Sequence, residues 1–312
     1  MMNYAMLFPG QGSQSVGMLG GFAAPVVAQT FDEASAVLGW DVGALVREGP
    51  EQELNRTQRT QPALLAADIA LWRLWQQRGL PPPTALAGHS LGEYAALVAA
   101  AALDFSDALR LVERRGALMQ AAVPEGTGAM AAVIGLDDAQ VAALCAAYTG
   151  EGVLEPANFN SPGQVVVAGH ARAIDWVLGE AKTHGARMAV RVPMSVPSHC
   201  SLMRGAAEAL FAEMAKIELR TPQIPVLHNL DAAPRREPDA IRVALREQLH
   251  RPVRWTQTIE ALVGDGIAAF VECGPGRVLC GLGKRIAKAV PALPTDDPAA
   301  FDKASAAIAA AG

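Results

Sequence analysis

Cysteine is scarce in this sequence, which contains only four among 312 residues. They are irregularly spaced and include no Cys-x-x-Cys pair, the arrangement that often marks a zinc or dithiol site. The four are Cys145, Cys200, Cys273 and Cys280. Such a distribution favours free thiols in a reducing compartment over a disulfide framework or a zinc site. We therefore predict a cytoplasmic protein that holds no metal.

A targeting segment, a membrane span and an excess of positive charge are also missing. The chain starts a strand almost at once, without the basic and apolar stretches of a secretory signal, and no apolar run reaches membrane-spanning length. Its net charge is −5, so no general positive field attracts nucleic acid or a membrane surface. A hydrophobic fraction of 51% with 18% charge is typical of a folded globular protein.

Signatures of nucleotide binding are incomplete. The apolar segment 4–8 predicts a short strand, and Pro9-Gly10-Gln11-Gly12-Ser13-Gln14 follows it. Glycines directly after a strand suggest a phosphate-binding loop, but neither Gly-x-x-x-x-Gly-Lys-Ser/Thr nor Gly-x-Gly-x-x-Gly occurs there. Two interpretations stay open: a structural turn, or a loop that offers backbone N–H groups or the Gln11 amide to an oxyanion.

The most informative feature that is present is Gly88-His89-Ser90-Leu91-Gly92. The apolar run behind three consecutive prolines predicts a short buried strand before it, and residues 93–103 are rich in helix formers. A strand, a sharp turn and a helix form the context of a nucleophile elbow, in which glycines let the backbone crowd together and expose the serine hydroxyl. The alternative is a serine in an ordinary tight turn.

A second feature is an arginine inside an apolar stripe of the predicted helix 106–122. At about 100° per residue, apolar side chains lie on both sides of Arg115, whereas Arg110 and Arg114 point away. A guanidinium in such a stripe is costly unless an anion meets it. The partner is either an Asp or Glu in a structural salt bridge, or a substrate carboxylate bound by two parallel N–H···O contacts.

Strands and helices alternate along the chain, which predicts an α/β fold with a parallel sheet covered on both faces. From residue 125 to 194 the predicted order changes to β-α-β-β-α-β, that of a ferredoxin-like unit, with Asp137 and Gln140 in capping-box position. We therefore predict a discontinuous large catalytic subdomain, residues 1–124 and 195–312, and an inserted small subdomain, residues 125–194.

Several further elements are expected in the large subdomain. They are helices at 62–77, 201–217 and 239–249, strands at 223–229 and 267–272, and a peripheral helix within 296–310. His199 falls just before one of these helices, where the helix N-terminus is expected to lower its pKa and favour the neutral base. Considered alone, its sequence context favours an ordinary surface or capping histidine over a catalytic one.

Six motifs now resemble a known family. In chain order they are Phe8-Pro9-Gly10-Gln11-Gly12-Ser13-Gln14, Gly88-His89-Ser90-Leu91-Gly92-Glu93-Tyr94, Arg115-Gly116, Asn158-Phe159-Asn160-Ser161-Pro162-Gly163-Gln164, Ser195-Val196-Pro197-Ser198-His199 and Glu272-Cys273-Gly274-Pro275-Gly276. Together they resemble the malonyl-CoA:acyl carrier protein transacylases of bacterial fatty acid synthesis, from about residue 4 to 286. The resemblance implies an α/β-hydrolase-like large subdomain with an inserted ferredoxin-like one.

The resemblance also implies roles for individual residues. Ser90 would be the nucleophile, His199 its general base and Arg115 the group that holds the malonyl carboxylate.

Four further positions carry over less directly. The backbone N–H groups of Gln11 and Leu91 would form the oxyanion hole, and the main-chain carbonyl of Gln248 would orient the histidine. Near Gln248 the sequence differs from the family's usual motif, because His250-Arg251-Pro252 occupies the place where an Asn-Pro is common. Asn160 would line the pocket.

The implied activity is S-malonyltransfer from coenzyme A to the phosphopantetheine thiol of acyl carrier protein, by a ping-pong mechanism, without a metal or cofactor and with a monomeric enzyme. An acidic carrier protein needs local positive charge near the site despite the negative total. The basic candidates for its docking are Arg187, Arg191, Arg251, Arg254, Lys284, Arg285 and Lys288.

Other interpretations stay open at this point. A polyketide-type loading domain or a malonate-decarboxylase subunit would use a similar elbow and the same arginine. An α/β-hydrolase esterase would share Gly-x-Ser-x-Gly, but a His-Gly-Gly-Gly-type loop is missing and the ferredoxin-like insertion would be unexplained. A non-catalytic carrier-binding protein would not depend on Ser90.

Overall fold

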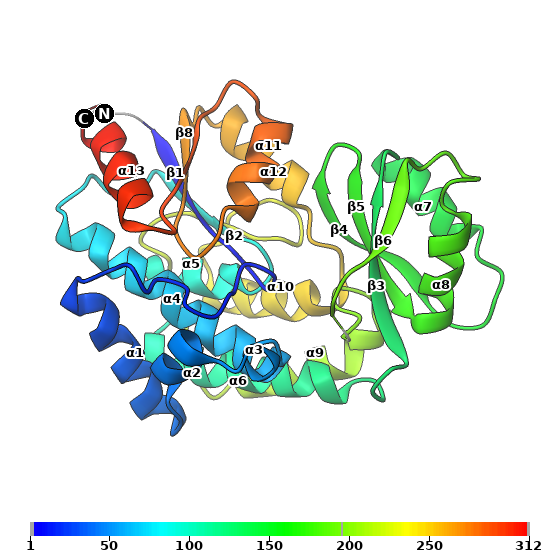
Figure 1. Ribbon diagram of the computed structural model, residues 1–312, viewed down its shortest axis with the longest axis horizontal. Helices are drawn as coiled ribbons and strands as arrows, with labels where there is room; N and C mark the ends of the chain where they lie inside the picture. Colours follow the sequence, from blue (N-terminus) through cyan, green and yellow to red (C-terminus); the bar gives the residue numbers. More distant parts are fainter. Residues whose placement is uncertain (1–2, 195, 311–312) are drawn as a thin grey trace.

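The computed structural model describes residues 3–194 and 196–310. Ser195, where the predicted large subdomain resumes, lies outside the described residues, as do positions 1–2 and 311–312 at the ends of the predicted segments. Two sheets organise the described chain, a larger one on the left of Figure 1 and a smaller one on the right.

The strands of the larger sheet all run parallel, in the order β7-β2-β1-β8-β9. Their bounds are β1 Tyr4–Phe8, β2 Ala85–Gly88, β7 Val226–Leu227, β8 Ala269–Glu272 and β9 Ala292–Pro294. Because parallel strands end at one edge, the segments after β1, β2, β7 and β8 meet there, which is where α/β proteins bind ligands. The glycine-rich loop and the serine elbow thereby become neighbours.

Helices cover both faces of this sheet (Figure 1). Residues of β1 alternate between two cores: Tyr4, Met6 and Phe8 face one, and Ala5 and Leu7 face the other. The bounds of the helices are α1 Pro25–Leu38, α2 Val42–Glu48, α3 Glu51–Leu54, α4 Thr57–Gln77, α5 Gly92–Ala99, α6 Phe105–Ala121, 3₁₀ helix η1 Ser201–Met203, α9 Arg204–Met214, α10 Pro238–His250, α11 Trp255–Gly264, α12 Val278–Ile286 and α13 Pro298–Ala310. The α/β prediction with a parallel sheet is confirmed.

The smaller sheet is antiparallel, in the order β4-β5-β3-β6, which is the ferredoxin-like arrangement predicted from the sequence. Its strands are β3 Gly128–Ile134, β4 Leu154–Ser161, β5 Gln164–His170 and β6 Met188–Arg191, and its helices are α7 Asp138–Ala146 and α8 Ala171–Glu180. The predicted capping box is present at the start of α7: Asp137 accepts from the Gln140 N–H, and the Gln140 side chain accepts from the Asp137 N–H.

Several predicted boundaries were wrong. Helix α4 begins at Thr57 and carries Pro62 inside it, at the cost of one i→i−4 hydrogen bond, so this proline does not mark the helix start. The helix after the elbow ends at Ala99 because Ala101 adopts a left-handed φ of 57°. The predicted strand 223–229 contracts to β7, and the predicted helix 201–217 is η1 followed by the shorter α9.

The structure contains further elements that were not predicted from the sequence. Helices α1, α2, α3 and α11 and strand β9 were not predicted, and the C-terminal helix α13 is not peripheral. Phe301 of α13 is buried and packs edge-on against Trp75 and Phe22, with ring centroids 5.6 and 5.9 Å apart. This alanine-rich helix therefore completes the main core through a few large side chains.

Candidate active site

Ser90 lies at the turn between β2 and α5, with a left-handed φ of 53° that strains a non-glycine residue. The two motif glycines permit this turn. A Cβ atom on Gly88 would lie 1.9 Å from the Gly92 carbonyl carbon, and one on Gly92 would lie 2.1 Å from the Phe8 carbonyl oxygen. The backbone crowding predicted for a nucleophile elbow is thus present, and it also brings the β1 loop against the elbow.

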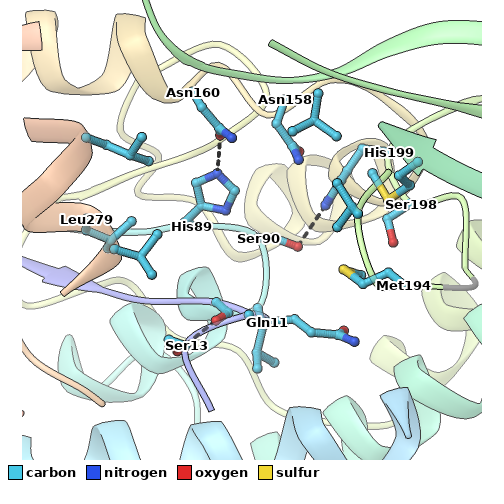
Figure 2. A pocket seen from close by; sticks show the side chains of 18 of the residues that line it. Gln11, Ser13, His89, Ser90, Asn158, Asn160, Met194, Ser198, His199 and Leu279 are labelled. Carbon is cyan, nitrogen blue, oxygen red and sulfur yellow. Dashed lines mark hydrogen bonds between the residues drawn. The ribbon is translucent and has the colours of Figure 1, made fainter. Parts of the chain in front are cut away.

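The structure brings His199 to Ser90 although 108 residues separate them in the chain. The distance from Ser90 Oγ to His199 Nε2 is 2.8 Å (Figure 2), and His199 Nδ1 lies 2.7 Å from the Gln248 carbonyl oxygen. A carbonyl only accepts, so Nδ1 carries the ring proton. The Nε2 lone pair therefore faces the serine hydroxyl, which donates to it.

His199 is only 3% exposed, and burial is the main cause that lowers its pKa, to about 3. The positive charge of Arg115 is the second cause. The lower pKa was predicted from the position before a helix, but that attribution was wrong, because the segment that follows is the three-residue η1. Burial among apolar groups keeps this imidazole neutral at ordinary pH.

Arg115 is 1% exposed, on the apolar face of α6 where the helical periodicity placed it. Its Nη1 donates to Gln61 Oε1 at 2.9 Å, and its Nη2 donates to Gln248 Oε1 at 3.0 Å and to Ser90 Oγ at 3.2 Å. Within the described part of the chain, no Asp or Glu forms a salt bridge with it. The guanidinium is therefore held by neutral acceptors beside the nucleophile, and its charge is left for an incoming anion.

Two backbone N–H groups flank the same serine. Gln11 lies in the loop after β1, which Gly10 fits so closely against the elbow that a Cβ there would lie 2.3 Å from the His89 carbonyl oxygen. Leu91 is the first residue after Ser90, at the N-terminus of α5. Among residues 3–194 and 196–310, neither N–H has an acceptor. Two such donors, one in a loop and one at a helix start, can hold a negatively charged oxygen.

Asn160 extends from the irregular β4, and its Oδ1 lies 2.8 Å from His89 Nε2 (Figure 2). The His89 ring also packs on the indole of Trp255, with ring centroids 5.3 Å apart, and burial lowers its pKa. Asn160 therefore lines the same pocket from the smaller sheet, and it contacts the residue before the serine but not the serine itself.

These groups surround a cavity of about 180 Å³ between the two sheets. One wall is formed by the elbow, the β1 loop, His199 and Arg115. The other wall comes from the smaller sheet and the segment that follows it, through Met130, Asn158, Asn160, Val166, Val192 and Met194. The cavity is small for a whole drug-sized ligand but has room for a short acyl group.

All seven residues singled out in the sequence lie around this cavity or hold a residue that does. Gln248 contributes through its carbonyl, as expected, and also through its side chain, which the sequence analysis did not anticipate. Gln61, Glu93, His228 and Asn229 were missed. Glu93 lies inside the elbow motif, and a charged residue in an otherwise apolar helix is a local signal of a buried polar contact. The other three have no local signal.

In the described residues, no helix is long and apolar enough to cross a membrane. The four cysteines are free thiols, as the sequence predicted, and all four are buried.

A parallel-sheet fold with a serine on a strand-to-helix elbow, a histidine on its hydroxyl and two backbone donors without an acceptor in the described residues defines the class of enzymes that form an acyl-serine intermediate. The family described as acyl transferase domain matches residues 5–297. Among curated proteins, the chain is 53% identical over 303 residues to the malonyl CoA-acyl carrier protein transacylase of Escherichia coli K12, covering 96% of this chain and 98% of that one. It is 39% identical to the protein of the same name from Bacillus subtilis, with coverages of 97% and 96%.

Solved structures with a similar fold belong to the same family as these curated relatives. An acyl carrier protein S-malonyltransferase from Vibrio cholerae superposes with a TM-score of 0.94 at 52% identity, covering 97% of this chain and 99% of that one. A malonyl-transacylase in complex with a type II polyketide acyl-carrier protein superposes with a TM-score of 0.96 at 51% identity, with the same coverages. The chain belongs to the malonyl CoA-acyl carrier protein transacylase family.

Proposed function

We propose that this protein is a malonyl-CoA:[acyl-carrier-protein] S-malonyltransferase of bacterial fatty acid synthesis. It moves a malonyl group from coenzyme A to the phosphopantetheine thiol of acyl carrier protein through a malonyl ester on Ser90. One observation carries the proposal: Ser90 Oγ lies 2.8 Å from a neutral imidazole and 3.2 Å from a buried guanidinium that has no carboxylate partner in the described chain. The first contact activates the hydroxyl, and the second selects an acyl group that ends in an anion.

In the first half-reaction, His199 Nε2 takes the proton of Ser90 Oγ as the oxygen attacks the thioester carbonyl carbon. The Gln248 carbonyl stabilises the imidazolium that forms, through Nδ1–H. Collapse of the tetrahedral intermediate breaks the C–S bond, and His199 returns the proton to the departing coenzyme A thiolate. The product is a malonyl-serine ester with the histidine neutral again.

The charge that develops on the carbonyl oxygen needs donors already in place. We assign this role to the N–H groups of Gln11 and Leu91, whose hydrogen-bonding capacity is unused by the described residues. Donors of this kind contribute on the order of 3 kcal/mol each to the transition state in comparable enzymes.

In the second half-reaction the thiol of acyl carrier protein attacks the malonyl ester, and the steps run in reverse. The solved relative in complex with an acyl-carrier protein supports this choice of partner. Both half-reactions use only side chains and backbone groups of this protein and the thiols of coenzyme A and acyl carrier protein. The proposed transfer therefore needs no cofactor. A cytoplasmic monomer fits such a role in a pathway of soluble carriers.

The basic residues proposed for carrier docking differ in how they are engaged. Arg191 pairs with Asp175 and lines a second cavity that shares Gln11, Val192 and Met194 with the first. Arg251 forms a salt bridge with Glu247, with 2.7 Å between Nε and Oε2. We expect reversal of Arg187, Arg191, Lys284 and Arg285 together to weaken carrier docking and remove much of its salt dependence. Unchanged kinetics in that variant would remove these residues from the docking surface.

The test of the function is acyl labelling. Purified protein is mixed with radiolabelled malonyl-CoA or acetyl-CoA, and the label is mapped by peptide mass spectrometry, with Ser90→Ala as control. A stable malonyl ester on Ser90 that passes to acyl carrier protein supports the transferase. Rapid release of free malonate would indicate an esterase instead, and no label would indicate a binding protein.

A further inference from the structure

A buried cluster of polar side chains lies behind the elbow, and none of these side chains exchanges a proton or contacts the acyl group in the proposed transfer. Its centre is Glu93, the second residue of α5, which is fully buried. Glu93 Oε1 lies 2.7 Å from His228 Nδ1, and Oε2 accepts from the Asn229 N–H and from Gln248 Nε2, both at 3.0 Å. A carboxyl group in an apolar core is costly unless donors satisfy it, and here three do.

Asn229 connects this cluster to the nucleophile. Its Oδ1 accepts from the Ser90 N–H at 2.7 Å, and its Nδ2 donates to the Gly88 carbonyl at 2.6 Å. Strands β2 and β7 pair side by side and end just before these residues. The Asn229 amide thus continues their hydrogen-bonding beyond the ends of the strands, across the left-handed residue. A strained conformation persists only where its surroundings fix it from several sides.

Gln248 connects the cluster to the arginine. Its Nε2 donates to Glu93 Oε2 and, at 2.9 Å, to the Ser90 carbonyl, while its Oε1 accepts from Arg115 Nη2. Because two acceptors face the nitrogen end of this amide, the oxygen end is turned towards the guanidinium. An amide with the opposite orientation would bring two donors together and release Arg115 Nη2.

We propose that Asn229 and Glu93 are positioning residues with separable effects on the reaction. Asn229 holds the elbow, so it sets how fast Ser90 is acylated by any donor. Glu93 holds the Gln248 amide and through it the Arg115 guanidinium, so it sets how strongly a carboxylated acyl group is preferred. The inference rests on the proposed function, since it concerns the same serine and arginine.

The experiment measures single-turnover acylation of Ser90 by rapid quench, with malonyl-CoA and acetyl-CoA side by side. We expect Asn229→Ala to slow both donors by a similar factor, about 10- to 100-fold, with their ratio unchanged. We expect Glu93→Ala to lower the malonyl-to-acetyl ratio of the second-order acylation rate constants at least tenfold, chiefly through weaker binding of malonyl-CoA.

Glu93→Gln is the conservative rescue. Its amide oxygen still accepts from Asn229 and Gln248, and its amide nitrogen can donate to His228 Nδ1 once the ring proton moves to Nε2, which has no partner in the described structure. This variant should retain most of the malonyl preference. Glu272→Gln is the matched control, because Glu272 is another fully buried glutamate, at the end of β8, and should leave the ratio unchanged.

A folded Glu93→Ala protein with the wild-type ratio, or a folded Asn229→Ala protein with the wild-type acylation rate, would overturn the proposal. So would a Glu93→Gln protein as unselective as Glu93→Ala. If either alanine variant does not fold, as judged by thermal unfolding, Asn229→Ser and Glu93→Asp are measured in its place and the same outcomes decide. Failure of the wild-type protein to form malonyl-Ser90 would instead refute the proposed function.

Discussion

The two walls of the cavity differ in what they contribute. The large region, residues 3–124 and 196–310, supplies Ser90, His199, Arg115 and the free N–H groups of Gln11 and Leu91. Among the described residues, those of the small region (125–194) that line the cavity are uncharged side chains such as Met130 and Val166. Reactivity is therefore built into a tightly packed parallel-sheet edge, and the facing sheet shapes the space in front of it.

The largest expected effect comes from removing the charge of the large region's wall. Arg115→Ala should lower kcat/KM for malonyl-CoA by about 10²- to 10³-fold, because a buried carboxylate would lose its charged partner. Transfer from acetyl-CoA should persist, since acetyl has no carboxylate. The measurement is steady-state transfer to acyl carrier protein with each donor.

The control for that experiment is Arg114→Ala, the neighbour on the same helix, whose exposed side chain pairs with Glu213. It should leave both donors unaffected. If Arg115→Ala slowed transfer from both donors equally, the guanidinium would be a structural group. The large region's wall would then not select acyl groups by their charge.

The next effect concerns pH and the buried histidine. With a His199 pKa of about 3, kcat/KM for acetyl-CoA should stay level from pH 8 down to pH 5. An ordinary histidine with a pKa near 6.5 would lose about 30-fold over the same range. Arg115→Met should move the acid limb to higher pH, because the cation that helps to lower the pKa of His199 is gone. A rate that falls through pH 6.5 in the wild-type protein would contradict this prediction.

A smaller effect is expected from the opposite wall. Met130→Ala should enlarge the cavity and raise turnover of a donor with one extra methyl group, such as methylmalonyl-CoA, about tenfold relative to malonyl-CoA. Acylation of Ser90 by acetyl-CoA should change little. Val133→Ala is the control, because Val133 lies on the same strand but packs into the core of the small region. A Met130 variant that loses acylation with every donor would show that this wall also positions the reacting groups.

The sequence predicted this arrangement best where a local pattern determines it. The elbow at Ser90 and the capping box at Asp137 follow from a few adjacent residues, and the apolar stripe around Arg115 follows from helical periodicity. Asn229 and His228 could not be predicted, because their roles depend on the pairing of β7 with β2, which joins segments far apart in the chain. The cause of the low His199 pKa was likewise inaccessible, since burial is a property of the whole fold.

The smallest effect on activity, and a distinct effect on stability, is expected at Glu272. Burial raises the pKa of this carboxyl to about 7. A raised pKa means that the folded state prefers the protonated acid, so the contribution to stability is complete below the unfolded pKa of about 4.3 and is lost as the pH rises through 7. Glutamine is uncharged like the protonated form, and the one backbone hydrogen bond that its amide nitrogen cannot accept is lost at every pH. The free energy of unfolding of Glu272→Gln should therefore rise relative to that of the wild type by about 2.5 kcal/mol between pH 5 and pH 8.

Urea unfolding at the two pH values measures this gain, with the exposed Glu48→Gln as control for the loss of one negative charge. Equal pH dependence in Glu272→Gln and wild type would mean that the Leu279 and Cys280 N–H groups, which donate to the two carboxylate oxygens, satisfy the ionised form. A gain confined to Glu272 would place a pH-sensitive element of stability at the end of β8, next to the strand that carries the β1 loop. The rigidity of the reactive wall would then weaken above neutral pH without any change in the catalytic groups themselves.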